Sequence, residues 1–156
     1  MNLFRGIAIL IALIGASAAQ AADSVMLASE VFVEKIVTGS DGRPQVLLQH
    51  PKRVMPGDDL VFILKYRNAG QAAAKSFSVT NPLPRAVSFR ETTEKSAVYS
   101  VDGGRIWGAL PALQVRADDG RLRLARPDDV THVRWTFRQP LPAGASGRLS
   151  FRGTVR

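Results

Sequence analysis

The sequence contains no cysteine, so the protein has no disulfide bonds and offers no thiolate as a nucleophile or metal ligand. Histidine is scarce as well, and the two present, His50 and His132, are far apart in the chain. A catalytic zinc site usually takes three protein ligands, commonly including histidine or cysteine. The sequence also lacks Gly-x-Ser-x-Gly, phosphate-loop and dinucleotide-binding motifs. We therefore expect a non-enzymatic protein with no catalytic residues, no metal site and no cofactor.

Long apolar runs are absent, with one exception near the N-terminus. Residues 7–14 form an apolar run that follows Arg5 and precedes Ala19 and Ala21, the small residues read by signal peptidase. A transmembrane anchor is the alternative, but the run is shorter than the about 20 residues needed to cross a bilayer. We expect a signal peptide over residues 1–21 and export to the periplasm or the extracellular space. The mature chain should then have no transmembrane segment.

Acidic residues are outnumbered by basic ones, 13 against 21, which gives a formal net charge of +8. Such an excess favours acidic partners: anionic lipid headgroups, acidic glycans, nucleic acid or acidic proteins. A basic surface that is simply solvated explains the same composition. No specific nucleic-acid binding is expected.

Helical periodicity is missing beyond the N-terminal run, and apolar residues alternate with polar ones instead. The clearest strand covers residues 60–66, with Lys65 directed away from the core. Further strands are expected around 30–37, 45–48, 77–79, 87–89, 98–101, 105–107, 130–138 and 148–156. Short strands separated by turns predict an all-β protein, an immunoglobulin-like antiparallel β-sandwich of about seven to nine strands. This domain should span residues 30–156, after a flexible segment at 22–29.

The C-terminal third carries two more specific expectations. Residues 109–127 look like an insertion that is long enough for a short hairpin. The strands at 130–138 and 148–156 are expected to pair with each other, because Leu141-Pro142-Ala143-Gly144 between them reads as a turn. Trp135 alternates with polar neighbours, so its side chain is expected in the core.

Several turn motifs resemble one family. Residues 54–58, 66–70 and 79–84 read V-M-P-G-D, Y-R-N-A-G and V-T-N-P-L-P, and residues 141–146 read L-P-A-G-A-S. Their order and spacing over residues 30–156 resemble the bacterial conserved-repeat domain (domain of unknown function 11). The resemblance implies an immunoglobulin-like module of the cell envelope with no known catalytic site. Asn81 departs from the family's usual aspartate, and one copy stands here where the family often forms tandem arrays.

One hairpin motif could contact a glycan. Residues 100–107 contain Ser-x-Asp-x-Gly-x-x-Trp, the pattern of an Asp box, in which the serine and aspartate side chains bond turn amides and the tryptophan packs over the turn. An exposed Trp107 would offer a sugar-stacking surface. A self-sufficient turn without a ligand is the favoured interpretation.

Paired acids occur at residues 58–59, 118–119 and 128–129, all at expected turns. Adjacent carboxylates on a loop can bind calcium, but none of these pairs has the spaced ligand pattern of a known calcium loop. Capping of turns and solubility are the favoured roles.

The candidate binding surface is a basic one. If the last two strands pair, Arg134 and Arg138 share an outward face with Arg148, Arg152 and Arg156. Guanidinium groups in such a stripe suit bidentate contacts with carboxylate or phosphate. A solvated face that discourages edge aggregation is the alternative.

Three functions fit these patterns. The first is a non-enzymatic module that binds or organises other components of the cell envelope. The second is a soluble binder of an acidic glycan or another anionic envelope polymer, through the arginine face and Trp107. The third is an assembly factor that donates or accepts a strand at a sheet edge. The partner expected is therefore an envelope protein or an anionic polymer.

Overall fold

A computed structural model describes residues 25–156 of the chain. The expected signal peptide and residues 22–24 lie outside the described residues. The described part forms ten strands and two short 3₁₀ helices. The elements are β1 Val25–Thr38, β2 Pro44–Gln49, β3 Asp59–Asn68, β4 Ser78–Pro82, β5 Val87–Thr92, β6 Ala97–Ser100, η1 Leu110–Ala112, β7 Gln114–Arg116, β8 Leu122–Leu124, η2 Pro127–Asp129, β9 His132–Thr136 and β10 Ser146–Val155.

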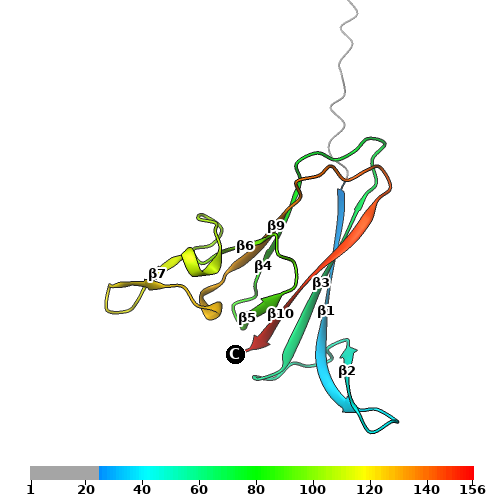
Figure 1. The fold of residues 1–156 in the computed structure, drawn as a ribbon. Coiled ribbons are helices and arrows are strands. Elements are labelled where there is room, and N and C mark those ends of the chain that lie inside the picture. The colour runs from blue at the N-terminus through cyan, green and yellow to red at the C-terminus, as the bar shows by residue number, and fades with distance from the viewer. Residues whose placement is uncertain (1–24) are drawn as a thin grey trace, which may run out of the picture.

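The strands form two larger antiparallel sheets and a small ribbon (Figure 1). The first sheet has five strands in the order β2-β1-β3-β10-β5, and the second has three in the order β4-β9-β6. These eight strands lie within the expected seven to nine, and the β7–β8 ribbon adds two more. The all-β antiparallel fold class predicted from the sequence is therefore confirmed. The ribbon also confirms a short hairpin within residues 109–127.

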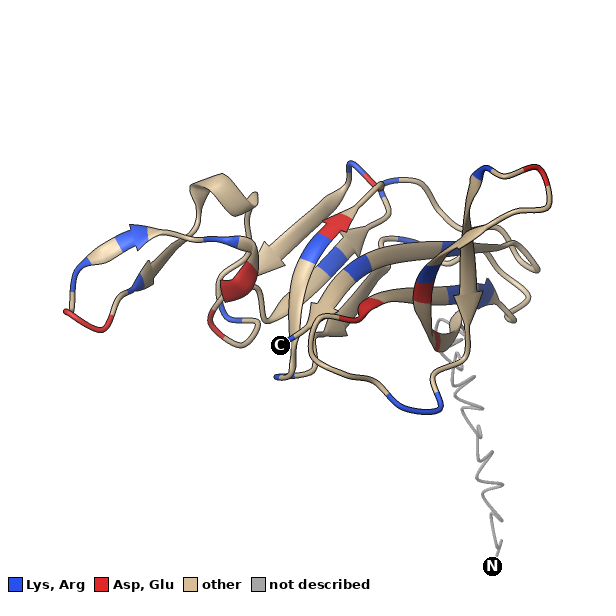
Figure 2. Cartoon of the chain, turned by 90° about the horizontal axis from the view of Figure 1, so that it is seen from below, with Lys and Arg blue, Asp and Glu red and all other residues tan. Residues whose placement is uncertain are grey.

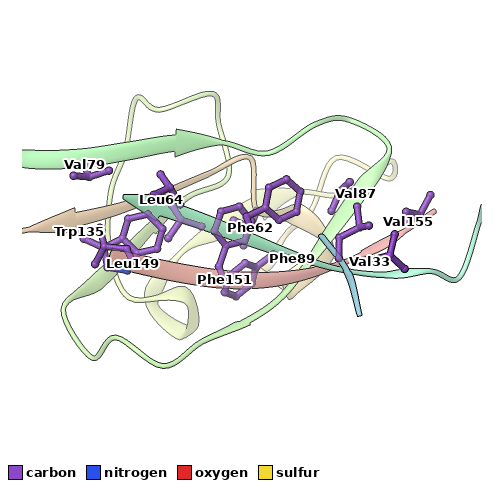
Figure 3. Close-up of a cluster of buried hydrophobic side chains, with 13 residues drawn as sticks. Val33, Phe62, Leu64, Val79, Val87, Phe89, Trp135, Leu149, Phe151 and Val155 are labelled. Atoms are coloured by element: carbon purple, nitrogen blue, oxygen red, sulfur yellow. The ribbon is translucent and has the colours of Figure 1, made fainter. Parts of the chain in front are cut away.

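One hydrophobic core lies between the two larger sheets (Figure 3). Phe62 of β3 and Phe151 of β10 stack with their ring centroids 4.5 Å apart. Trp135 of β9 enters the same core from the second sheet and is 0% exposed. Strand alternation thus placed Trp135 correctly. Packing of two sheets over a shared core is the arrangement of a β-sandwich.

The expected pairing of the last two strands is wrong. β9 lies between β4 and β6, whereas β10 lies between β3 and β5 in the other sheet. Asn68 at the end of β3 provides the physical reason. Its buried side-chain amide donates to the carbonyl oxygens of Ala72 and Leu141, and its backbone carbonyl accepts from Gly144. The link between β9 and β10 is therefore tied over the end of the core and crosses from one sheet to the other.

Two further differences concern strand ends. β1 begins at Val25, which pairs with Asn68, so residues 25–29 belong to a strand and not to a flexible segment. Residues 105–107 form no strand, and only Gly108 makes a single bridge to Tyr99 of β6. Among residues 25–156, no helix has the length and apolar character to cross a membrane.

Candidate functional site

The sequence-predicted arginines do not form one stripe. Arg134 lies on β9 in the three-stranded sheet, and Arg138 follows the end of that strand. Arg148 and Arg152 lie on β10 in the five-stranded sheet. All four alternate with core residues, so the two pairs face away from opposite sides of the sandwich. Figure 2 shows basic residues spread over both sheets, with acidic residues among them.

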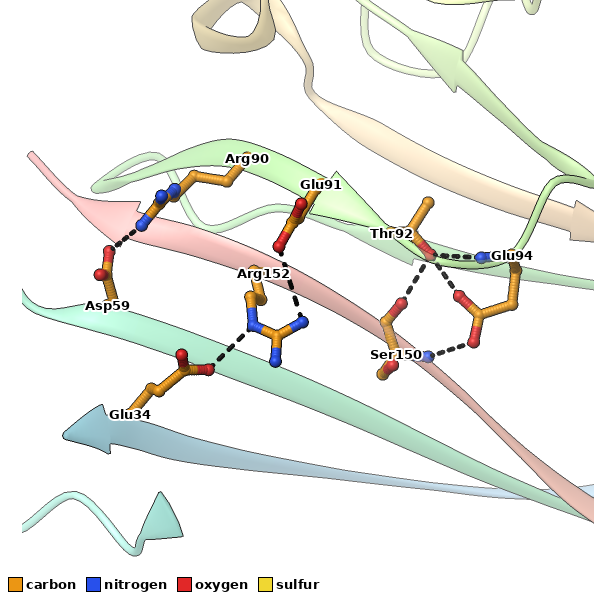
Figure 4. Close-up of polar contacts among 8 residues, drawn as sticks. All are labelled: Glu34, Asp59, Arg90, Glu91, Thr92, Glu94, Ser150 and Arg152. Carbon is orange, nitrogen blue, oxygen red and sulfur yellow. Dashed lines mark hydrogen bonds and ion pairs between the residues drawn. The ribbon is translucent and has the colours of Figure 1, made fainter. Parts of the chain in front are cut away.

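Arg152 is engaged by carboxylates of its own sheet (Figure 4). Its Nε atom donates to Glu34 Oε2 at 2.8 Å, and its guanidinium lies 3.7 Å from Glu91. The hydrogen bond to Glu34 raises the pKa of Arg152 above its ordinary value. Two carboxylates thus neutralise this guanidinium, which is unsuited to binding a further anion.

The neighbouring part of the same face is also internally paired (Figure 4). Arg90 donates to Asp59 at 2.7 Å, and the Thr154 hydroxyl donates to the same oxygen at 2.8 Å. These two hydrogen bonds lower the pKa of Asp59, and the one from Arg90 has the larger effect. Burial acts in the opposite direction but is outweighed. Arg156, the last member of the expected stripe, donates to Ser88 Oγ and to the Asp128 carbonyl.

The Asp box forms as the sequence predicts. Ser100 Oγ donates to Asp102 Oδ1 at 2.7 Å, and the amides of Arg105 and Ile106 donate to the same oxygen, each at 3.0 Å. Because these groups bond the charged form of the carboxylate, they lower the pKa of Asp102, and the hydrogen bond from the Ile106 amide has the largest effect. Positive backbone φ angles at Gly103 and Gly104 allow the chain to turn there.

Trp107 is part of this turn and only half-buried. Its Nε1 atom donates to the Gly104 carbonyl at 2.9 Å, which holds the indole over the turn. The Arg134 guanidinium carbon lies 3.7 Å from the ring centroid, and Arg134 Nε donates to Thr80 Oγ1 at 2.9 Å. One face of the indole is therefore covered by a cation–π contact. These contacts support the structural role of the motif, and they occupy the face that a sugar would need.

The histidines lie in separate environments. His50 contacts Phe32 with 4.6 Å between ring centroids and the two rings tilted by 39°, whereas His132 bonds Thr131 Oγ1 and contacts Trp107 edge to face. Within residues 25–156, no group of three or more histidine, cysteine, aspartate or glutamate side chains is placed to hold a metal ion.

At least one carboxylate of each acidic pair has a local structural partner. Asp58 accepts from the Met55 amide and Asp119 from the Arg121 amide. Asp129 accepts from the Arg126 amide and from both terminal nitrogens of Arg123. These contacts fit the predicted capping roles.

A different cluster of cations lies at the other end of the five-stranded sheet. Here β1, β3 and β10 line an open hollow of about 560 Å³. Strand register places Arg148 directly opposite Lys65, and Arg67 one row further along between Met26 and Ser146. We call this surface the basic hollow; its outward-facing residues are Met26, Ala28, Lys65, Arg67, Ser146 and Arg148.

The cations of the basic hollow differ in their pairing. Lys65 Nζ lies 2.8 Å from Glu30 Oε2. Arg67 and Arg148 have no acidic side chain within ion-pair distance in the described part of the chain. The sequence showed that Lys65 faces outward, but the pairing of β3 with β10 was needed to join it to Arg148. Of the predicted binding residues, Arg148 alone is in this cluster.

Comparison with protein-family models, with curated proteins and with solved structures finds no match to this chain.

Proposed function

We propose that this protein is a non-enzymatic binding module of the bacterial cell envelope, which holds an acidic polymer at the basic hollow. The proposed location in the cell envelope is supported by the signal-peptide features of the N-terminal sequence, which are Arg5, the apolar run 7–14 and Ala19-Gln20-Ala21. The resemblance of the turn motifs to the conserved-repeat domain supports the same address. A binding role is supported by the surface chemistry of the five-stranded sheet.

The observation that carries the proposal is the contrast between the two ends of this sheet face. At one end, carboxylates neutralise Arg90 and Arg152. At the other end, Arg67 and Arg148 lie on adjacent strands without a carboxylate partner among residues 25–156. Neighbouring strands are about 4.8 Å apart, so both guanidinium groups can contact one chain of repeating anions. Charge left unpaired in a concave surface attracts a ligand of opposite sign.

The apolar lining suits a polymer with a carbon backbone between its charges. Met26 is 64% exposed at the hollow, and Ala28 lies beside it in the same row as Lys65 and Arg148. A guanidinium fork matches a carboxylate in a bidentate manner, while the apolar residues can contact a sugar ring. An acidic polysaccharide combines both features. Since the arginines are exposed, binding should be weak and sensitive to salt.

The test is retention on immobilised alginate, a polyuronate, across a salt gradient. The double variant Arg67→Ser/Arg148→Ser should elute at clearly lower salt than the wild type. Arg134→Ser/Arg138→Ser is the matched control, because it removes the same charge from β9 and the residues that follow it, away from the hollow. The control should elute close to the wild type. Equal loss of retention in both variants would mean that only net charge matters, and would refute the hollow as the site.

The envelope address has its own test. N-terminal sequencing of the protein from a cell fractionation should begin at Ala22, following cleavage after Ala21. An intact Met1 terminus in the membrane fraction would point to an anchor and contradict the proposed processing.

A further inference from the structure

The outer edge of β2 is open. β2 is the last strand of the five-stranded sheet and pairs only with β1 among the described residues. All six of its residues are exposed, including Val46, Leu47 and Leu48. Figure 1 shows β2 and its turn extending away from the rest of the sandwich. Unpaired backbone amides and carbonyls on such an edge are a template for another strand.

The opposite edge of the same sheet, at β5, is protected against strand addition. β5 carries Arg90 and Glu91, and its pairing with β10 is interrupted by a register shift between Arg152 and Gly153. Charges and bulges of this kind discourage edge-to-edge association. β2 has neither a charged residue nor a register shift, and Pro44 stands only at its first position. One edge of the sheet is therefore closed to strand addition and the other is open.

The sequence of β2 reads nearly the same in both directions. Residues 45–49 are Gln-Val-Leu-Leu-Gln, with glutamine at both ends and apolar residues between. We propose that two copies of this chain associate through β2, in an antiparallel pair centred on Leu47. In this register Leu47 faces Leu47 of the second copy, Val46 faces Leu48, and Gln45 faces Gln49. Such a two-fold arrangement presents the same patch on both sides, as an isologous interface requires.

The proposed register joins apolar residues that are otherwise isolated. On one face of the β1–β2 hairpin, Ile36 is 77% exposed and lies opposite Val46, which is 59% exposed. Pairing would place Leu48 of the second copy next to Val46, so the three side chains form one row. On the other face the two Leu47 side chains meet, each flanked by Lys35 of its own copy. Cross-strand apolar pairs of this kind stabilise a sheet.

The association should stop at two copies. Pairing consumes the unprotected edge of the five-stranded sheet that residues 25–156 form, and its β5 edge remains protected by charges and the register shift. A six-residue strand pair buries less surface than a standard interface of about 1,200–2,000 Å², so we expect a dissociation constant in the micromolar range. The product is a closed dimer and not a filament.

The first test is sedimentation equilibrium of the full-length chain as the host cell processes it, over a micromolar concentration series. The wild type should form dimers, and Leu47→Lys should weaken dimerisation at least tenfold by placing two like charges opposite each other. Leu122→Lys is the matched control, since Leu122 is an exposed leucine on the β7–β8 ribbon. Thermal unfolding of each variant checks its fold. A monomeric wild type throughout the series would overturn the proposal.

The second test determines the register and uses the absence of cysteine from the chain. Leu47→Cys should form a disulfide-linked dimer on mild oxidation, because residue 47 faces its own copy. Val46→Cys alone should cross-link much more slowly, and the double variant Val46→Cys/Leu48→Cys should cross-link readily. Equal cross-linking of Leu47→Cys and a Leu122→Cys control would indicate random collision and refute the β2 pair.

Discussion

Arg152 on β10 bonds Glu34 on β1 across the intervening strand β3, with 2.8 Å between Nε and Oε2. Register explains the diagonal reach, because Arg152 is opposite Val61 and Glu34 is opposite Asp59, two positions along β3. Three strands are thus linked by one ion pair on the outer face of the sheet. The same contact removes Arg152 from the residues that can bind an external anion.

The first prediction concerns this pair. Arg152→Ala and Glu34→Ala should each reduce the free energy of unfolding, and their effects should be non-additive because they remove one shared interaction. Both side chains are partly buried, so a coupling energy near the upper part of the ~0.2–1 kcal/mol range for exposed pairs is expected. Chemical denaturation of the two single variants and the double variant measures it. Additive effects would show that the pair contributes nothing to stability.

A second prediction tests the centre of the core. Trp135→Ala should destabilise the protein by about 3–5 kcal/mol, as is usual for a buried aromatic side chain. Trp135→Phe should cost less, because it keeps an aromatic ring in the core and leaves a smaller cavity, and it too removes the buried Nε1 group that has no hydrogen-bond partner among the described residues. Denaturant unfolding followed by circular dichroism provides the comparison. Equal losses for the two variants would contradict the prediction, because they would mean that a retained ring fills none of the cavity.

Close backbone packing gives a third prediction, at Gly153 of β10. A Cβ atom there would lie 2.5 Å from Val87 Cγ1 and 2.8 Å from the Ser88 carbonyl oxygen. Because the second contact is with backbone, β5 would have to move, and Gly153→Ala should cost about 1–3 kcal/mol. Gly108→Ala is the control, since its nearest contact is Leu113 Cδ2 at 3.4 Å. Comparable melting temperatures for both variants would contradict the predicted clash.

Much of the fold could be predicted because strand alternation reports which face a residue occupies. Phe62, Leu64 and Trp135 are buried as their alternation indicates. Alternation does not report which strands are neighbours, and the expected β9–β10 hairpin was wrong for that reason. The turn-like sequence at 141–144 is held instead by the buried amide of Asn68, a long-range contact that has no periodic signal.

The candidate site was likewise predictable where its contacts are local in the sequence, and not where they depend on which strands pair. Local chemistry identified the Asp box, since Ser100, Asp102 and Trp107 interact within one turn. The basic hollow depends on the pairing of β3 with β10, which joins residues far apart in the sequence. The outward direction of Lys65 could be read from the sequence, but its proximity to Arg148 could not.

The fourth prediction concerns acid stability. Hydrogen bonds from the Ile106 amide and the Ser100 hydroxyl hold the pKa of Asp102 below its ordinary value in the folded state. A depressed folded-state pKa contributes stability above the unfolded-state value, and this contribution is lost as the pH falls below about 4. Asp102→Asn should therefore lower the melting temperature at neutral pH and reduce its decline under acid conditions. Asp118→Asn, at the tip of the β7–β8 ribbon, is the control with the same change of charge. Parallel pH profiles for wild type and Asp102→Asn would contradict the prediction.

The last prediction links stability to binding at the basic hollow. Arg148 and Lys65 are directly opposite on neighbouring strands, and like charges in such positions repel. Glu30 offsets part of this repulsion through its 2.8 Å contact with Lys65. Arg148→Gln should therefore raise the melting temperature in low salt by about 1–3 °C. The gain should vanish in about 1 M salt, where the Debye length is roughly 3 Å.

A bound polyanion should stabilise the wild type and the Arg148→Gln variant to different extents. Alginate should raise the melting temperature of the wild type, because a ligand that binds the folded state stabilises it, and should raise that of Arg148→Gln much less. Arg138→Gln removes one charge just after β9, away from the basic hollow, and should respond to alginate as the wild type does. Repulsion and ligand affinity then share Arg148, since the charge that destabilises the free sheet is one that the ligand neutralises. If Arg148→Gln were more stable in low salt yet responded fully to alginate, the repulsion would be real but the polymer would bind elsewhere.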